Sequence, residues 1–321
     1  MEKSECCKIR QIGMSGRESP LLVPSFSSTA FPKTADVRLA MNDLKSQVAV
    51  SSLISAYDAY HGYIDKEVGL SDVVIIDSGN YERHVLEGLG CSVRWTRDRH
   101  SATINSMVPL TQIAIVNYDE PGPLSEQADF ATDFFKSHPE YATDFLCRPL
   151  TTSSPYTDMP TITKSIDLFS DFDVFGVTEE ELGPSLIEKC KRLLELRQCL
   201  NSQGLEIPIH VFGCFEPMTI VLMSILGGDI FDGLTWARYD MREELLMAPG
   251  SIPFFDQKWS IDDSSIRRAL ASHNLSQMTE LMIRLRSYAR THAFSELHLS
   301  PKAEKLARSL LTQVTGKSEW A

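Results

Sequence analysis

The stretch GGDIFDGLTWARYD, residues 227–240, begins with small and apolar residues and ends a short run abruptly on Asp232. Gly233, Trp236 and Arg238 follow the aspartate in place of a plain polar turn. A short apolar run that stops on one polar side chain is typical of a buried parallel strand, because both faces of such a strand are covered. The fold therefore depends on how many runs of this kind the chain contains.

Seven further apolar runs, rich in Val, Ile and Phe, end in small or polar residues. They are LLVPSFSST (21–29), QVAVSS (47–52), DVVIIDSG (72–79), QIAIVNYD (112–119), DFLCRPLTT (144–152), FDVFGVTE (172–179) and PIHVFGCF (208–215). Helical spacing separates them, most clearly at 180–204, where Leu186, Leu193, Leu196 and Leu200 mark an apolar side. Eight strands alternating with helices predict a closed (β/α)8 TIM barrel rather than an open doubly wound sheet.

The pattern changes after Asp256. The segments 264–275, 277–294 and 300–314 have helical composition, and Ser264 and Ser300 are suitable N-caps, the latter followed by Pro301. We therefore divide the chain into a barrel domain at 1–256 and a helical C-terminal extension at 257–321. The polar segment 151–163 is expected to be a long loop at the top of the barrel.

Composition limits the class of protein. The net charge is −12, which argues against a surface that binds nucleic acid non-specifically, although residues 258–321 carry ten Lys and Arg against six Asp and Glu. The first residues lack the apolar run of a secretory signal, and TIVLMSIL (219–226) is too short to cross a bilayer, so a cytoplasmic protein without membrane contact is expected. Seven cysteines without Cys-x-x-Cys predict no disulfide framework, and Cys6 and Cys7 are expected in a disordered terminus.

Polar residues collect where the expected strands end. DSGNY (77–81), NYDEP (117–121) and FDG (231–233) place Asp77, Asp119 and Asp232 at one end of a barrel, where active sites of this fold form. A single aspartate there is more often a helix cap, but three on separate strands with adjacent glycines favour a site. Carboxylates that face one another suit chemistry at a sugar carbon, where one attacks the carbon and another moves a proton. The histidines His100, His138, His210 and His298 lack metal-ligand spacing and are expected to be ordinary core or surface residues.

Taken in order, five motifs resemble those of the tRNA-guanine transglycosylases, which exchange a guanine in nucleic acid for a 7-deazaguanine. They are IIDSGNYE (75–82), AIVNYDEP (114–121), VFGVTEEELG (174–183), IHVFGCFEP (209–217) and GGDIFDGLTWAR (227–238). The family carries Asp-Ser-Gly-Gly-aromatic, Phe-Asp-Glu, a glycine-rich strand end, and Gly-x-x-x-Pro leading into Asp-x-Phe-Asp and then Arg. The resemblance covers about residues 20–242.

The resemblance implies a role for each matched residue. Asp232 would be the nucleophile that displaces guanine and holds the ribose covalently, and Asp77 the general base. Asp119 would bind the N–H edge of a guanine-like ring, with backbone contacts from Gly176. The other expected substrate-binding residues are Ser78, Tyr81, which could stack on the base, Gly213, and Arg238, which would pair with a phosphate or ribose.

The chain also departs from the family pattern. Asn80 stands where the family has a second glycine, Glu82 stands where it has glutamine, and CRPLTTSSP (147–155) occupies the region of a second, base-binding glutamine. No cysteine follows Cys214, so the family's zinc motif is absent and no cofactor is expected. The implied partners are tRNA or DNA, a guanine or 7-deazaguanine base, and a second copy of the chain in a homodimer.

A second group of residues suggests how nucleic acid could dock without that zinc. It consists of the tail arginines Arg267, Arg268, Arg284, Arg286 and Arg290, together with Arg94, Trp95, Arg97 and Arg99 of another loop. Two alternatives to the transglycosylase stay open, a non-catalytic partner subunit with the same barrel and a hydrolase of a small N-glycoside.

Overall fold

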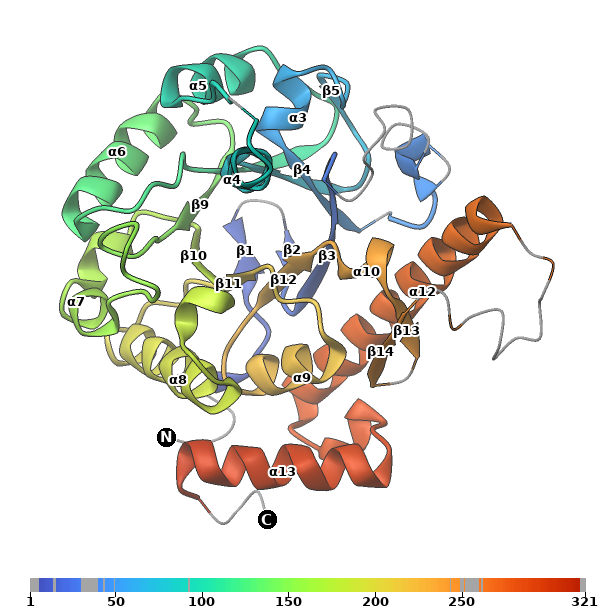
Figure 1. Cartoon of the computed structure of the whole chain (residues 1–321). Coiled ribbons are helices and arrows are strands. Elements are labelled where there is room, and N and C mark those ends of the chain that lie inside the picture. Colours follow the sequence, from blue (N-terminus) through green and yellow to red (C-terminus); the bar gives the residue numbers. More distant parts are fainter. Residues whose placement is uncertain are drawn as a thin grey trace.

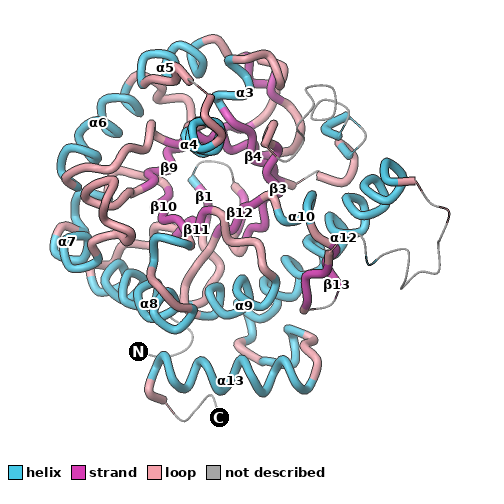
Figure 2. Tube along the Cα trace, viewed as in Figure 1, coloured by secondary structure: helices cyan, strands magenta, loops and turns pink. Residues whose placement is uncertain are grey.

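The computed structural model describes residues 6–13, 16–29, 40–42, 44–48, 50–91, 93–242, 244–248, 251, 260 and 262–317. Eight parallel strands close into a barrel with helices around it, which confirms the predicted (β/α)8 fold (Figures 1 and 2). In order around the barrel they are β3 (Leu21–Phe26), β4 (Ser51–Ser55), β6 (Val73–Asp77), β8 (Gln112–Val116), β9 (Ala142–Leu146), β10 (Val174–Thr178), β11 (Ile209–Phe212) and β12 (Ile230–Gly233).

Six of the eight strands coincide with the runs expected from the sequence. The fifth, β9, lies earlier than its expected run at 144–152, since it spans Ala142–Leu146. The second strand is displaced in the other direction. The sequence placed it at 47–52, but β4 begins at Ser51. The N–H groups of Gln47 and Val48 both donate to the carbonyl oxygen of Leu44, at 2.8 and 3.2 Å, so this part of the run forms a turn. The strand that follows, SSLIS, is fully buried although three of its five residues are serines.

The outer layer consists of helices, and three two-stranded sheets lie outside the barrel. The helices are α3 (Ala56–Tyr60), α4 (Asn80–Gly88), α5 (Arg97–Asn105), α6 (Leu124–Lys136), α7 (Met159–Lys164), α8 (Leu186–Ser202), α9 (Pro217–Ile225), α10 (Thr235–Arg238), α12 (Asp263–Thr291) and α13 (Pro301–Thr315), with 3-10 turns η2 (Ile166–Phe169), η3 (Glu180–Leu182) and η5 (Phe294–Leu297). The sheets pair β1 (Gln11–Ile12) with β2 (Arg17–Glu18), β5 (Glu67–Val68) with β7 (Val108–Pro109), and β13 (Asp240–Arg242) with β14 (Leu245–Met247). In α8 the expected apolar side is buried at Leu193, Leu196 and Leu200, whereas Leu186 is exposed. Within the described residues, none of the helices is both long and apolar enough to cross a membrane.

Helix α12 packs directly on the barrel. Leu275, Met278 and Met282 of this helix are buried in the main core, and they share a small cavity with Leu22 of β3. The expected domain boundary after residue 256 falls outside the described residues. Ser300 caps α13 as predicted, by accepting the N–H of Ala303 at 3.3 Å.

Two smaller predictions are wrong, one about the start of α12 and one about the N-terminal cysteines. Ser264 does not precede the helix, because α12 already begins at Asp263 and Asp262 accepts the N–H of Ser265 at 3.0 Å. Cys6 and Cys7 are buried in the core rather than in a disordered terminus. All seven cysteines are free, as expected.

A buried ionic network around Asp229 stabilises the end of the barrel at which the strands begin. One carboxylate oxygen accepts from Arg10 at 3.0 Å and from Ser19 at 2.8 Å. The other accepts from Arg197 at 2.5 Å and from the N–H of Ile209 at 2.9 Å. Because all of these groups are buried and mutually bound, the network is structural and ties the N-terminal segment to α8 and β12.

Candidate active site

A cavity of about 410 Å3 opens at the carboxyl ends of the barrel strands. Its lining includes the three strand-end aspartates, which therefore converge on one space as the sequence predicted. Of the residues expected in the site, Asp77, Ser78, Tyr81, Asp119, Gly213, Asp232 and Arg238 all line it. Their roles in binding or catalysis stay predictions.

Gly176 is the one expected site residue that does not belong to this lining. It is buried in β10, and its carbonyl oxygen accepts the N–H of Cys147 at 2.9 Å. A Cβ atom at this position would lie 2.6 Å from a ring carbon of Phe212, which does line the cavity. The absence of a side chain at Gly176 therefore makes room for the Phe212 ring, and the expected contact of its backbone with a ligand stays a prediction.

Asp232 lies at the end of β12 and is nearly buried, with 6% of its surface exposed. Its Oδ2 accepts from the hydroxyl of Ser25 at 2.7 Å, and its Oδ1 accepts the N–H of Gly213 at 2.9 Å. Gly213 has a φ of 72°, a left-handed conformation that favours glycine and here directs the N–H to the carboxylate. The turn that follows is anchored by Trp236, whose indole N–H donates to the Ser25 carbonyl oxygen at 3.0 Å.

His210 adds a cation that the sequence analysis missed. It is fully buried, and its Nδ1 donates to Oδ2 of Asp144 at 2.6 Å. Its Nε2 lies 3.4 Å from Oδ1 of Asp232. Burial by itself would lower the pKa of the ring, but Asp144 and then Asp232 raise it to about 9. The signal was available in the sequence, since His210 stands two residues before Phe212 and thus on the same, inward side of its strand.

Asp77 is placed in a contrasting environment. One of its oxygens accepts the N–H of Gly79 at 3.2 Å. Burial, and then the charges of Asp119 and Glu82, raise the pKa of Asp77 well above its usual value, with a smaller contribution from Asp232. Asp77 therefore favours the protonated form, which suits a group that exchanges a proton with a ligand.

Asp119 is already bound on both of its oxygens. Oδ1 accepts from the Ser78 hydroxyl and from Nδ2 of Asn80, the latter at 3.2 Å. Oδ2 accepts from Nη1 of Arg148, and Nη2 of the same guanidinium donates to Glu181 at 2.6 Å. Arg148 follows β9 in the segment where no base-binding glutamine could be placed, and it lines the cavity. A base that used Asp119 would have to displace or share this guanidinium.

Two further buried carboxylates lie beside the cavity. Glu82, which replaces the family's glutamine, accepts from the hydroxyls of Ser27 and Ser55, and burial and the charge of Asp58 raise its pKa to about 7. Asp58 accepts from the backbone N–H and the hydroxyl of Ser28, at 2.7 and 2.6 Å. Burial raises the pKa of Asp58 to about 6, against the hydrogen bonds from Ser28.

The rim of the cavity carries residues that face solvent. Tyr81 is 46% exposed, so it is a surface residue free to stack and not a core tyrosine. Arg238 is also exposed and touches the protein through a hydrogen bond of 3.4 Å to the carbonyl oxygen of Thr29. Trp95, expected as a nucleic-acid contact, is 3% exposed and donates to the carbonyl oxygen of Ser78 at 2.9 Å, so it supports the site from behind.

Most of the arginines proposed to dock nucleic acid are engaged within the protein. Arg286 donates to the backbone carbonyl oxygens of Glu18 and Pro20, at 2.6 and 3.0 Å. Arg284 pairs with Glu280, Arg290 with Glu18, and Arg97 with Glu120. Arg99 donates to the carbonyl oxygen of Arg94. Arg267 and Arg268 are exposed on α12 and keep the predicted role open.

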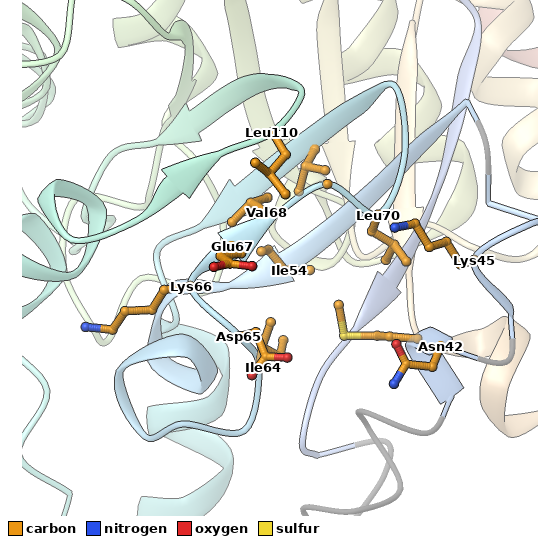
Figure 3. A pocket seen from close by; sticks show the side chains of 13 residues that line it. Asn42, Lys45, Ile54, Ile64, Asp65, Lys66, Glu67, Val68, Leu70 and Leu110 are labelled. Carbon is orange, nitrogen blue, oxygen red and sulfur yellow. The ribbon is translucent and has the colours of Figure 1, made fainter.

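A second cavity, of about 570 Å3, includes none of the expected site residues in its lining (Figure 3). Apolar side chains such as Ile54 and Leu110 form its wall, whereas Asp65, Lys66 and Glu67 at its edge are exposed. Across the described residues, no group of three or more His, Cys, Asp or Glu side chains is arranged to hold a metal ion. The strand-end cavity is the candidate active site because all three strand-end aspartates line it.

Comparison with known proteins points to the same family as the motifs. No family model matches the chain. A tRNA-guanine(15) transglycosylase of Methanococcus maripaludis strain C7 is 21% identical in an alignment of 339 positions, gaps included. The alignment covers 94% of this chain and 50% of the relative. The protein of the same name from strain C6 is 22% identical over 329 residues, covering 91% and 49%. The chain thus spans about half the length of the curated relatives it matches. Over nearly its whole length the chain is similar to tRNA-guanine(15) transglycosylases, in agreement with the resemblance of its strand-end motifs.

Proposed function

We propose that the protein is a base-exchange transglycosylase, a pentosyltransferase that replaces a guanine in tRNA or another nucleic acid by a 7-deazaguanine base. The observation that carries the proposal is the contrast between two carboxylates in one cavity. Asp232 is hydrogen-bonded and faces a cationic histidine, whereas Asp77 is crowded by other carboxylates. Two carboxyl groups in such unlike environments are suited to different tasks in catalysis.

The two carboxylates divide the reaction as follows. Asp232 attacks C1′ of the ribose, the bond from C1′ to the base nitrogen breaks, and an ester joins Asp232 to the sugar. Asp77 gives its proton to the departing base. The incoming base then attacks C1′, transfers its proton to Asp77, and releases Asp232 as a carboxylate. Protons and electron pairs balance over the two steps, and no external acid is consumed.

The rest of the lining supplies recognition. Tyr81 is positioned at the rim to stack on a base, and Arg238 to pair with a phosphate near the reacting nucleotide. Asp119 and Arg148 form the part of the cavity that would meet the polar edge of the base. The queuosine-type 7-deazaguanine is inferred from the family resemblance.

One observation favours a second candidate, the non-catalytic partner subunit. Asp119, the residue expected to read guanine, is neutralised by Arg148. A barrel that no longer reads the base could still serve as a binding subunit. The retained environment of Asp232 favours the enzyme, since a subunit without chemistry has no need of a nucleophile supported by Ser25 and Gly213.

The test is exchange of labelled guanine into separate pools of RNA, DNA and nucleosides, combined with denaturing gels that detect a covalent complex. We expect incorporation and trapping with the wild type and neither with Asp232→Ala. Glu120→Gln, which changes an exposed carboxylate outside the cavity lining, is the matched control and should behave as the wild type. Exchange by Asp232→Ala would refute the assignment. Release of free base without incorporation would indicate the N-glycoside hydrolase, and binding without either reaction the partner subunit.

A further inference from the structure

His210 makes a contact with the proposed nucleophile that the reaction described above does not use. Its Nδ1 is held by Asp144 at 2.6 Å, while its Nε2 points toward Oδ1 of Asp232 at 3.4 Å. This Nε2 is buried and has no hydrogen-bond partner among the described residues. The Phe212 ring stacks on the imidazole with centroids 3.6 Å apart, so the orientation of the ring is fixed.

The position of the ring decides its charge. Burial disfavours an imidazolium, but here one carboxylate lies on each side of the ring, Asp144 from β9 and Asp232 from β12. These two are the ionisable groups of the described residues that act on His210. Their combined attraction outweighs burial and raises the pKa of the ring to about 9. The ring therefore carries a positive charge at neutral pH.

We propose that His210, oriented by Asp144, is a positioning residue that holds a fixed positive charge beside Oδ1 of Asp232. This inference rests on the proposed function. It explains how two aspartates in one cavity can take different roles, because the cation lies next to one of them and not the other. It also gives Asp144, a fully buried carboxylate deep in the barrel, a task in the same reaction.

The second half of the reaction is where the cation matters most. When the incoming base displaces Asp232 from the sugar, negative charge returns to the carboxylate. A fixed cation near Oδ1 stabilises that developing charge without reorganisation, which is the property that makes preorganised electrostatic groups effective. Loss of the cation should therefore slow resolution of the covalent intermediate more than its formation.

The experiment compares His210→Gln and Asp144→Asn with the wild type in single-turnover exchange. Both variants should accumulate the covalent complex, with a resolution rate lowered about 100-fold. The alkaline limb of the pH–rate profile, which reports loss of the His210 proton, should disappear in His210→Gln and move to lower pH in Asp144→Asn. Affinity for the incoming base should be unchanged. Rates within about twofold of the wild type and an unmoved alkaline limb in both variants would overturn the proposal.

His100 offers a matched control. It is equally buried, but burial lowers its pKa to about 3 and it lies outside the cavity lining. His100→Gln should leave both the pH profile and the resolution rate unchanged. If the same changes appear in this variant, a general loss of packing and not the charge of His210 is responsible.

Titration of the imidazole by NMR tests the charge without any reaction. In the wild type the His210 ring, assigned from its absence in His210→Gln, should stay protonated through neutral pH and titrate near 9. In Asp144→Asn it should titrate at lower pH. A neutral ring at neutral pH would sink the inference even in an active enzyme. A protonated ring in a protein that exchanges no base would instead contradict the proposed function. His210 would then have no reaction in which to act as a positioning residue.

Discussion

Replacing Asp229 by asparagine should destabilise the protein strongly without touching the candidate site. Asp229 is 1% exposed and receives hydrogen bonds on both oxygens, including those from Arg10 and Arg197. Asparagine keeps one oxygen but turns the other position into an N–H donor that faces donors. Arg197 then loses the carboxylate that it binds, and Arg10 loses one of its carboxylate partners.

The magnitude follows from the burial of these cations. Removing one partner of a buried ion pair costs about 3–5 kcal/mol, because the remaining charge stays desolvated. Domains are stable by only about 5–15 kcal/mol, so this change is a large part of the total. The ratio of folded to unfolded protein should fall by roughly 100-fold to 4,000-fold, at about 1.4 kcal/mol per factor of ten.

The assay is urea unfolding followed by tryptophan fluorescence, with Trp95 and Trp236 as buried reporters. Asp232→Asn is the matched control, because it changes the other buried aspartate of the same strand region at the opposite end of the barrel. This control should lower the free energy of unfolding less than Asp229→Asn does, because His210 keeps its ion pair with Asp144 and the crowded cavity loses one negative charge. Equal midpoints for the two variants would refute the structural assignment of Asp229.

Three further sets of substitutions test the cavity and the helical extension. Burial raises the pKa of Glu82 to about 7, so the folded state holds this proton more tightly than the unfolded chain. The free energy of unfolding should therefore fall by up to about 3 kcal/mol as pH rises from about 4 to about 7. Glu82→Gln should flatten this dependence in urea unfolding between about pH 5 and about pH 8, and an unchanged slope would contradict the shift. Arg148→Gln should free the carboxylate of Asp119 and so raise the affinity for guanine in calorimetry, at a cost of about 3 kcal/mol in stability. Arg148→Lys conserves the charge and should not raise that affinity. Arg267→Glu combined with Arg268→Glu should lower by about two the slope of log affinity for RNA against log salt concentration. The control Arg286→Gln should lower stability and leave this slope unchanged. Identical slopes in the double variant and the control would remove the extension from the nucleic-acid interface.

The fold could be predicted because its signal is repeated. Eight apolar runs of similar length leave few alternatives to a closed barrel, and an error in one run is corrected by the others. The displaced strand shows the limit of this signal. Val48 and Val50 are more apolar than the serines of β4. Strand position is nevertheless decided by which backbone groups complete the barrel hydrogen bonds, and buried serine hydroxyls can find acceptors, as Ser51 does at the carbonyl oxygen of Leu22.

The candidate site could be predicted only where its residues end strands. Asp77, Asp119 and Asp232 have that position, so the topology alone brings them together. Arg148 does not stand out in the sequence, and the sequence could place His210 on the inward side of its strand but not beside its carboxylate partners. A side chain in a barrel acquires a role from its neighbours on other strands. The same limit explains Trp95, whose flanking arginines suggested a surface although the indole is buried.

The distribution of cations explains why the cavity can hold unlike acids. Arg148 pairs with Asp119, and His210 faces Asp232, so each of these carboxylates has a cation beside it. Asp77 instead accepts only a backbone N–H among its described hydrogen bonds and is surrounded by negative charge, which raises its pKa. Chemistry at a sugar carbon uses two carboxyl groups in different roles, and unlike environments suit such a division. In this barrel the difference follows from which strands bring a cation to the cavity, and His210 of β11 belongs to that arrangement together with the aspartates.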